Sequence, residues 1–381
     1  MDRMLKNGMT YKDSGVDYEA MDPFKRLCQL AASQTAGHLD RFGISEVEWS
    51  RGESCYLIET PWCYLAHVEE GLGTKNLVAE ALYNIALKSR QRLESGSSHF
   101  QKIAQCTVAM IVNDLITLGA LPVSVAMHLA TGSSDWFADE RRMADLVHGW
   151  RCACQLARCA WGGGETPTLP DIVYPGTVLL SGSAMGIIMP KENIIKPRLE
   201  PGVSIMLLGS SGIHANGLTL ARRIADKLAR GYAALLSDGQ PYGEALLEPT
   251  YIYVPIIEDL MDAGVKIRYT ANITGHGWRK LMRAQEPFVY VIEDIPEPQP
   301  VFRFIAEQGP VDQKEMYGNY NMGAGFALYV DEADVQKIIE VSSQHGIKAV
   351  RAGYLDRHGK DKKVIIRPLK LEYDAAELRV R

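Results

Sequence analysis

Strand-like alternation and helical periodicity take turns along this chain from about residue 55 onward, and this pattern limits the fold more than any other feature. A strand-like run at 63–68 leads into apolar residues at helical spacing between 77 and 85. The same exchange recurs with a helical stripe at 108–116 and an alternating run at 123–129. Strands that alternate with helices are typical of α/β proteins, in which helices cover the sheets.

The polar, proline-containing segment 191–202 divides the pattern into two successive halves. The alternation restarts beyond it with an apolar strand at 205–208. We therefore predict two domains, 1–195 and 196–381, in this chain of 381 residues. Within the first of them, the Gly- and Ser-containing stretch Ser89–Ser98 is predicted to be a surface excursion.

Charge and composition exclude several classes of protein. The chain has 41 Lys and Arg against 46 Asp and Glu, a net charge of −5, which argues against a nucleic-acid binder. Its apolar runs are far shorter than the ~20 residues that span a bilayer, and its opening residues lack the apolar core of a signal peptide. Seven scattered cysteines suit reduced thiols. We expect a soluble cytoplasmic protein that binds neither nucleic acid nor membrane.

A glycine-containing segment at 69–75, Glu-Glu-Gly-Leu-Gly-Thr-Lys, stands where a strand passes into a helix. Glycines in this place let backbone N–H groups approach a phosphate, and Lys75 adds positive charge. The carboxylate of Glu70 could hold a magnesium ion. The spacing is not that of a Walker A loop. A plain glycine turn with a solvated lysine is the alternative.

Two further segments combine carboxylates with glycines. Asn113 and Asp114 lie in an otherwise apolar helix, where a carboxylate needs a partner or a metal, unless Asp114 faces solvent or caps a neighbouring element. Glycines at 162–164 precede Glu165 and clear side chains from its approach. A plain loop is the alternative for this segment.

The segment 209–217, Gly-Ser-Ser-Gly-Ile-His-Ala-Asn-Gly, also lies between a strand and a helix. It offers hydroxyls, backbone donors and His214 to a ligand. A capped helix start would explain Ser211 without any ligand. Glycine-broken turns follow at 272–278 and 321–325.

Other site chemistries have weaker support. A zinc site at Cys152, Cys154 and Cys159 lacks the usual C-x2-C spacing and a second set of ligands. Serine hydrolysis lacks a G-x-S-x-G elbow. Carboxylates with backbone donors suit magnesium–phosphate chemistry instead.

Taken in order, the motifs resemble the aminoimidazole ribonucleotide synthetase family, also called phosphoribosylformylglycinamidine cyclo-ligases. The residues at 71–75 resemble the family's D-G-V-G-T-K, and those at 163–166 resemble its G-G-E-T. The resemblance covers nearly the whole chain, and the segments that carry it lie at 11–17, 71–75, 113–122, 163–166, 210–217, 247–254, 273–275 and 316–325.

This resemblance implies a two-domain α/β (α+β) enzyme. Its N-terminal domain would have a mixed sheet that forms a homodimer and would bind ATP beside the interface, and its C-terminal domain would be α/β. The implied reaction is the ATP-dependent cyclisation of formylglycinamidine ribonucleotide to 5-aminoimidazole ribonucleotide in purine biosynthesis. It proceeds through phosphorylation of the formamide oxygen, which asks the protein for positioning and charge neutralisation.

The resemblance also implies roles for individual residues. We expect three carboxylates to meet around a metal-bound triphosphate near Lys75, in a cleft between protomers. The expected catalytic residues are Lys75, Asp114, Glu165 and His214. The expected ATP contacts are Gly71, Gly73, Thr74, Lys75, Asn113, Gly163 and Gly164. The expected Mg2+ ligands are Glu70, Asp114 and Glu165, and the expected substrate contacts are Ser211, Asn216, Thr274 and Gly275.

Four positions depart from the family pattern. Glu70 replaces its aspartate, Asn272 replaces a histidine, His276 replaces a glycine and Gly318 replaces an arginine. These departures fall mostly on the substrate side. They leave open a paralogue that phosphorylates a different substrate, or a nucleotide-binding protein without catalysis. Residues Ser89–Ser98 read as an insertion relative to the family.

Overall fold

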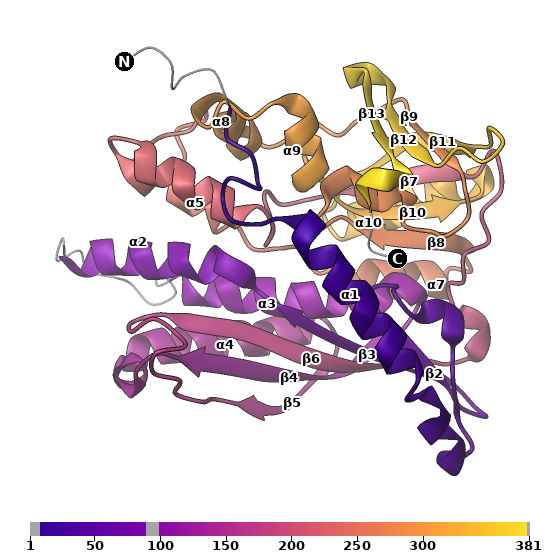
Figure 1. Cartoon of the computed structure of the whole chain (residues 1–381), viewed down its shortest axis with the longest axis horizontal. Helices are drawn as coiled ribbons and strands as arrows, with labels where there is room; N and C mark the ends of the chain where they lie inside the picture. The colour runs from indigo at the N-terminus through magenta and orange to yellow at the C-terminus, as the bar shows by residue number, and fades with distance from the viewer. Residues whose placement is uncertain (1–7, 89–98, 379–381) are drawn as a thin grey trace.

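A computed structural model describes residues 8–88 and 99–378, so the predicted excursion Ser89–Ser98 lies outside the described residues. Figure 1 shows two halves stacked on each other, each built around one sheet. The helices and strands of the first half are α1 (Tyr18–Ser33), β1 (Ser45–Glu46), β2 (Tyr56–Glu59), β3 (Tyr64–Gly71), α2 (Asn76–Lys88), α3 (Phe100–Leu115), β4 (Leu121–Thr131), α4 (Glu140–Leu156), β5 (Ala160–Glu165) and β6 (Val178–Ile188).

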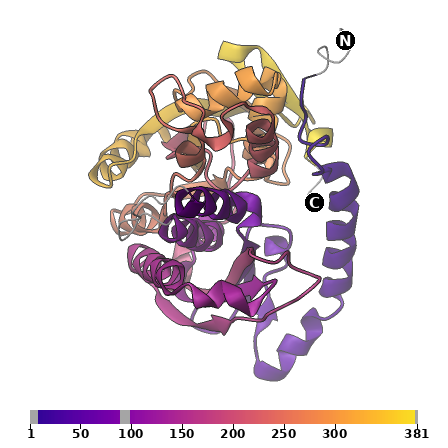
Figure 2. The ribbon, with the colours of Figure 1, turned by 90° about the vertical axis from the view of Figure 1, so that its left-hand side faces the viewer.

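The first sheet has six strands in the order β1-β2-β3-β6-β4-β5. It is mixed, because β4 and β5 are parallel while β6 is antiparallel to both β3 and β4. Helices α2, α3 and α4 lie on the face toward the second half, and the described chain leaves the opposite face uncovered (Figures 1 and 2). Burial along β6 alternates accordingly, with Leu180 and Ala184 buried and Leu179 and Met185 exposed.

The second half follows a connection of irregular chain. Its helices and strands are β7 (Ser204–Gly209), α5 (Leu218–Lys227), α6 (Tyr242–Leu246), α7 (Val254–Asp262), β8 (Ile267–Asn272), β9 (Val289–Ile292), α8 (Pro300–Gln308), α9 (Gln313–Asn319), β10 (Ala324–Val330), α10 (Val335–Gln344), β11 (Ala349–Asp356), β12 (Lys363–Ile366) and β13 (Leu371–Asp374).

The second sheet has seven strands in the order β13-β12-β9-β11-β7-β10-β8. It is also mixed, since β9 and β12 are parallel and the other neighbours are antiparallel. Its edge strand β8 packs against the first half, where the Thr270 hydroxyl donates to the backbone oxygen of Thr117 at 2.8 Å. Two mixed sheets with helices confirm the predicted fold class.

Several predictions about elements can be compared with the structure. The predicted boundary between 195 and 196 falls in the segment that joins β6 to β7, and it stays a prediction. The loop interpretation of 162–164 is wrong, because these glycines lie in β5. Helix α5 begins at Leu218, directly after the segment 209–217 that was predicted to lie between a strand and a helix. In the described ranges, no helix has the length and apolarity needed to cross a bilayer.

Candidate functional site

Two predicted site residues, Glu70 and Asp114, meet at the boundary between the halves. Glu70 lies near the end of β3, and Asp114, near the end of α3, is only 5% exposed. Their carboxyls are hydrogen-bonded to each other. Burial, followed by the negative charge of Asp114, raises the pKa of Glu70 to about 7. The interpretation that Asp114 faces solvent is therefore wrong.

The second half completes this cluster with Asn272, which the sequence analysis noted as a departure from the family pattern, and with Lys280, which it did not name. The Asn272 side chain, at the end of β8, donates to Asp114 Oδ1 at 2.7 Å. Lys280 extends from a short 3-10 helix, Gly277–Met282, and its ammonium donates to the Thr274 hydroxyl. Burial lowers the pKa of Lys280 to about 8, and the charges of Asp114 and Glu70 oppose this shift. The sequence signal was weak: a lysine beside a glycine-broken turn.

The N-terminal segment covers the loop that carries Thr274 and Gly275. The Tyr18 ring stacks on the His276 ring at 3.8 Å between centroids, and its hydroxyl accepts from the His276 backbone N–H at 3.3 Å. Asp22, from the next turn of α1, lies 3.5 Å from His276 Nε2. Burial lowers the pKa of His276 to about 3, so its ring is neutral at pH 7.

Three of the four predicted substrate contacts lie together. A Cβ added at Gly275 would lie 3.6 Å from Asn216 Oδ1, and Thr274 is the adjacent residue in the chain. Since Thr274 also accepts the hydrogen bond of Lys280, these three residues border the Glu70–Asp114 cluster. Both halves therefore contribute to one polar boundary region.

Lys75 lies in a second cluster between the halves. Its side chain is fully buried, and its ammonium donates to the backbone oxygens of His214 and Glu248, each at 2.7 Å. The interpretation of a solvated lysine is therefore wrong. Burial, followed by the nearby charge of Lys75, lowers the pKa of His214 to about 3. His214 Nε2 accepts from the Ser211 backbone N–H at 3.2 Å.

Ser211 does not cap a helix, because α5 begins seven residues later with Gly217 at its N-cap. Its hydroxyl donates to the Pro249 backbone oxygen at 2.5 Å. The other predicted loop residues also join the halves: Thr74 lies 3.2 Å from Thr219 between hydroxyl oxygens. Gly73 has φ +70°, a conformation that favours glycine.

Asn113 links α3 to the start of α7 through both ends of its amide. It donates to the Tyr251 backbone oxygen at 2.7 Å and accepts from the Tyr253 backbone N–H at 2.9 Å. Gly71 ends β3 shortly before Gly73 and Thr74 in the chain, and it is exposed. The predicted ATP contacts Thr74, Lys75 and Asn113 thus lie along the boundary region.

Glu165 lies elsewhere, on the uncovered face of the first sheet. It lines a cavity of about 420 Å³ together with Glu69, His128 and Ser181. The parallel pairing of β5 with β4 sets Glu165 opposite His128. Gly163 and Gly164 precede it in the same strand, so they lie apart from Glu70 and Asp114 as well.

The expected three-carboxylate metal site is therefore not assembled within one copy of the chain. Over 8–88 and 99–378, no three His, Cys, Asp or Glu residues are grouped so that they could hold a metal ion. Cys152, Cys154 and Cys159, the alternative zinc site, therefore do not form a metal-binding group either, and all three are free thiols.

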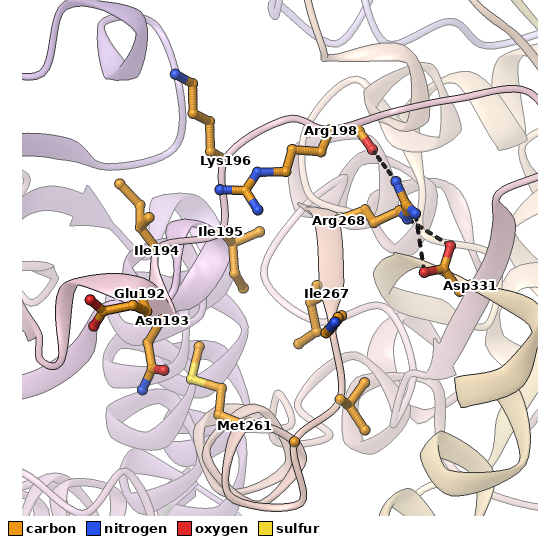
Figure 3. A pocket seen from close by; sticks show the side chains of 13 residues that line it. Glu192, Asn193, Ile194, Ile195, Lys196, Arg198, Met261, Ile267, Arg268 and Asp331 are labelled. Atoms are coloured by element: carbon orange, nitrogen blue, oxygen red, sulfur yellow. Dashed lines mark hydrogen bonds and ion pairs between the residues drawn. The ribbon is translucent and has the colours of Figure 1, made fainter.

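A separate cavity of about 330 Å³ lies between the connecting segment and β8 (Figure 3). On one side of it, Arg268 points toward Asp331, with nitrogen–oxygen distances of 2.7 and 3.1 Å. Lys196 and Arg198 also line it. None of the predicted site residues does so, which sets this cavity apart from the boundary region.

Comparison with known proteins matches most of the chain to one family. Residues 69–188 match the model "AIR synthase related protein, N-terminal domain", and residues 200–366 match "AIR synthase related protein, C-terminal domain". A phosphoribosylformylglycinamidine cyclo-ligase of Methanocaldococcus jannaschii is 33% identical over 345 residues, 90% of each chain. Another of Carboxydothermus hydrogenoformans is 33% identical over 350 residues, 90% of this chain and 94% of the relative.

Solved structures share the fold at low identity. The HypE–HypF complex matches with a TM-score of 0.57 and 15% identity, over 85% of this chain and 92% of the other. AaThiL complexed with AMPPCP and TMP matches with a TM-score of 0.54 and 13% identity, over 85% and 90%. T. maritima PurL complexed with ATP matches with a TM-score of 0.53 and 13% identity, over 85% of this chain and 46% of that one.

Proposed function

Because the chain belongs to the phosphoribosylformylglycinamidine cyclo-ligase family, we propose that it converts formylglycinamidine ribonucleotide and ATP into 5-aminoimidazole ribonucleotide, ADP and phosphate. The observation that carries this proposal is the full-length similarity: relatives of that name are 33% identical over 90% of the chain. The chain is accordingly a ligase of purine biosynthesis in this proposal.

The geometry supports different binding roles for the two halves. We assign ATP contacts to Gly71, Gly73, Thr74, Lys75, Asn113, Gly163 and Gly164, and substrate contacts to Ser211, His214, Asn216, Thr274 and Gly275. Asp114 is held by Asn272 across the boundary, so a carboxylate of the first half faces the Thr274–Gly275 loop of the second. Nucleotides bound to AaThiL and T. maritima PurL, which share the fold, add support for ATP.

The proposed reaction has two steps. The γ-phosphoryl group passes to the formamide oxygen, and ADP leaves with the electron pair of the broken bond. The amidine nitrogen then attacks the same carbon, phosphate departs and the imidazole ring closes. Both steps depend on holding the reacting groups in line and on stabilising negative charge, which suits a boundary region of fixed polar groups. We give Lys75, Asp114, Glu165 and His214 the catalytic roles.

Magnesium is the usual companion of ATP, and carboxylate oxygens are its preferred ligands. The predicted set does not fit one ion in a single copy, because Glu165 lies on the uncovered face of the sheet while Glu70 and Asp114 lie at the boundary region.

We further propose that two copies pair across the uncovered face of the first sheet and that the protein works in the cytoplasm. Val123, Leu179 and Met185 expose 41%, 50% and 49% of their surface there. A row of exposed apolar side chains on a sheet face marks an interaction surface. Pairing would also place Glu165 at the interface, beside the partner.

An assay of the purified protein with formylglycinamidine ribonucleotide, ATP and magnesium tests the function. We expect 5-aminoimidazole ribonucleotide by chromatography with mass detection, and growth rescue of a purine auxotroph that lacks the cyclo-ligase. Asp114→Asn should lower kcat by about 100-fold or more, because it removes a buried charge at the reacting groups. Asp262→Asn, on an exposed residue of α7, is the control.

Two results would contradict the proposal. Bound ATP with phosphorylation of another acceptor, but without an imidazole product, would indicate the divergent paralogue. ATP binding in calorimetry without turnover on any candidate amide would indicate a non-catalytic nucleotide-binding protein.

A further inference from the structure

Lys280 is a buried cation of the boundary region, and the proposed reaction gives it no role. Its residue is 8% exposed, and its ammonium donates to the Thr274 hydroxyl. An ammonium has three N–H donors, so a group that enters beside Thr274 can still receive a hydrogen bond from it. The short helix that carries Lys280 directly follows the Thr274–Gly275–His276 turn.

The charges around Lys280 come from both halves. Asp114 and Glu70 attract it from the first half, while Arg283 of its own segment and Lys25 of α1 repel it. Its pKa of about 8 leaves it mostly protonated at neutral pH. A fixed positive charge therefore stands on the substrate side of the boundary region, facing the carboxylates on the nucleotide side.

Phosphoryl transfer makes such a position useful. The transferred group spreads negative charge over three oxygens while it passes from one half to the other. A preorganised cation in a site that excludes water stabilises that charge without reorganising during the reaction. Gly318, at the position where the family pattern has arginine, carries no charge, but Arg279 donates to its backbone oxygen at 3.0 Å and so supplies a cation there. Lys280, the next residue, is the cation that borders Thr274.

We propose that Lys280 contacts the transferred phosphoryl group in the transition state of the first step, which makes it a further catalytic residue; this rests on the proposed function. The bond from the γ-phosphorus to the bridging oxygen of ADP breaks, and a bond to the formamide oxygen forms. The ammonium donates hydrogen bonds to the phosphoryl oxygens and keeps its proton. ADP takes the electron pair of the broken bond.

Two substitutions of Lys280 test this role. Lys280→Gln removes the charge and should lower kcat about 100- to 1,000-fold, while the Kd of ATP in calorimetry stays within about threefold. Lys280→Arg keeps the charge and should recover at least a tenth of the kcat. Lys337→Met, on the exposed face of α10, is the matched control and should match the unchanged protein. Thermal unfolding checks that each variant is folded.

The outcomes separate this inference from the proposed function. If the unchanged protein makes no 5-aminoimidazole ribonucleotide, the proposed function fails. If the unchanged protein is active and folded Lys280→Gln retains a kcat within threefold of it, the inference about Lys280 alone is overturned. An equal loss of kcat and of ATP affinity would also overturn it, because a structural defect would produce that result. Should Lys280→Gln not fold, a kcat of Lys280→Arg below 1% would count against the role.

Discussion

At the scale of single residues, the Glu70–Asp114 pair places two acidic groups where water cannot fully solvate them. The pKa of Glu70 is raised from 4.5 to about 7, first because of burial and then because of Asp114. A carboxyl with a raised pKa stabilises the folded state fully below its unfolded pKa, and this stabilisation is lost as the pH rises through the folded pKa. The window for Glu70 therefore runs from about pH 4.5 to about pH 7.

Glu70→Gln should remove this pH dependence. Between pH 5 and pH 8, the free energy of unfolding of the variant should rise by about 2 kcal/mol relative to that of the unchanged protein, because the amide is never charged. Glu70 is partly exposed, so this change in free energy is smaller than the full pKa shift would give. Urea unfolding at the two pH values, without magnesium, measures it. Glu69→Gln, on the exposed face of the same strand, is the control. A constant difference for Glu70→Gln would contradict the burial argument.

The sequence identified Glu70 and Asp114 because each lies in a motif with a recognisable chemical purpose. Their partners Asn272 and Lys280 lie far along the chain, with Asn272 158 residues after Asp114, and only the packing of β8 against the first half brings them close. The spacing of a motif carries no information about such long-range contacts. The family resemblance predicted substrate contacts at Thr274 and Gly275, but it did not indicate a role for Lys280.

At the scale of elements, β5 shows how a glycine-rich segment can be an edge strand. The segment 162–164, for which a plain loop was the alternative interpretation, belongs to a strand that pairs with β4 in parallel, with one register shift between Val125 and Ala126. Close packing explains the glycines: a Cβ at Gly164 would lie 2.1 Å from the Met127 backbone oxygen, and one at Gly162 would lie 2.2 Å from the Ser124 hydroxyl. Composition alone favours a turn, since glycine is rare within strands.

Gly164→Ala should therefore destabilise the protein. The added methyl group must displace the backbone of β4 or β5, which costs about 1–3 kcal/mol of unfolding free energy. Thermal unfolding measures the loss, and hydrogen exchange should show faster exchange of the amides in β5. Gly37→Ala is the control, because a Cβ there meets no atom within 4 Å. Equal stability of the two variants would mean that β5 does not pack as closely as described.

The pairing of β5 also decides where Glu165 points. Alternate residues of a strand face opposite sides of the sheet, so one extra residue moves a side chain from one side to the other. The register shift in this pair could not be read from the sequence. Prediction of the motif was therefore possible, while prediction of its face was not.

At the scale of the whole molecule, the uncovered sheet face and the boundary region between the halves are separate surfaces. The first has exposed apolar side chains and Glu165, and the second holds the polar clusters around Asp114 and Lys75. The alternation of strands and helices predicted two successive α/β halves. It did not predict α1, which runs along the side of both halves in Figures 1 and 2.

Met185→Asp should prevent pairing of two copies. A charge on a side chain that pairing would bury must be desolvated on association, so the variant should remain monomeric at concentrations where the unchanged protein is a dimer. Light scattering after size-exclusion chromatography measures the mass of each. Leu156→Asp, at the 52% exposed end of α4, is the control and should leave the mass unchanged. An unchanged protein that is monomeric at every concentration would contradict the pairing.

The hydrogen bonds of Lys75 have a consequence for nucleotide binding. Its ammonium already donates hydrogen bonds to the backbone carbonyl groups of His214 and Glu248, and both residues belong to the opposite half. A phosphate that recruited this lysine would have to compete with them. Binding of the nucleotide would then weaken the contacts between the halves at the boundary region. When these contacts form again, they would favour release of ADP.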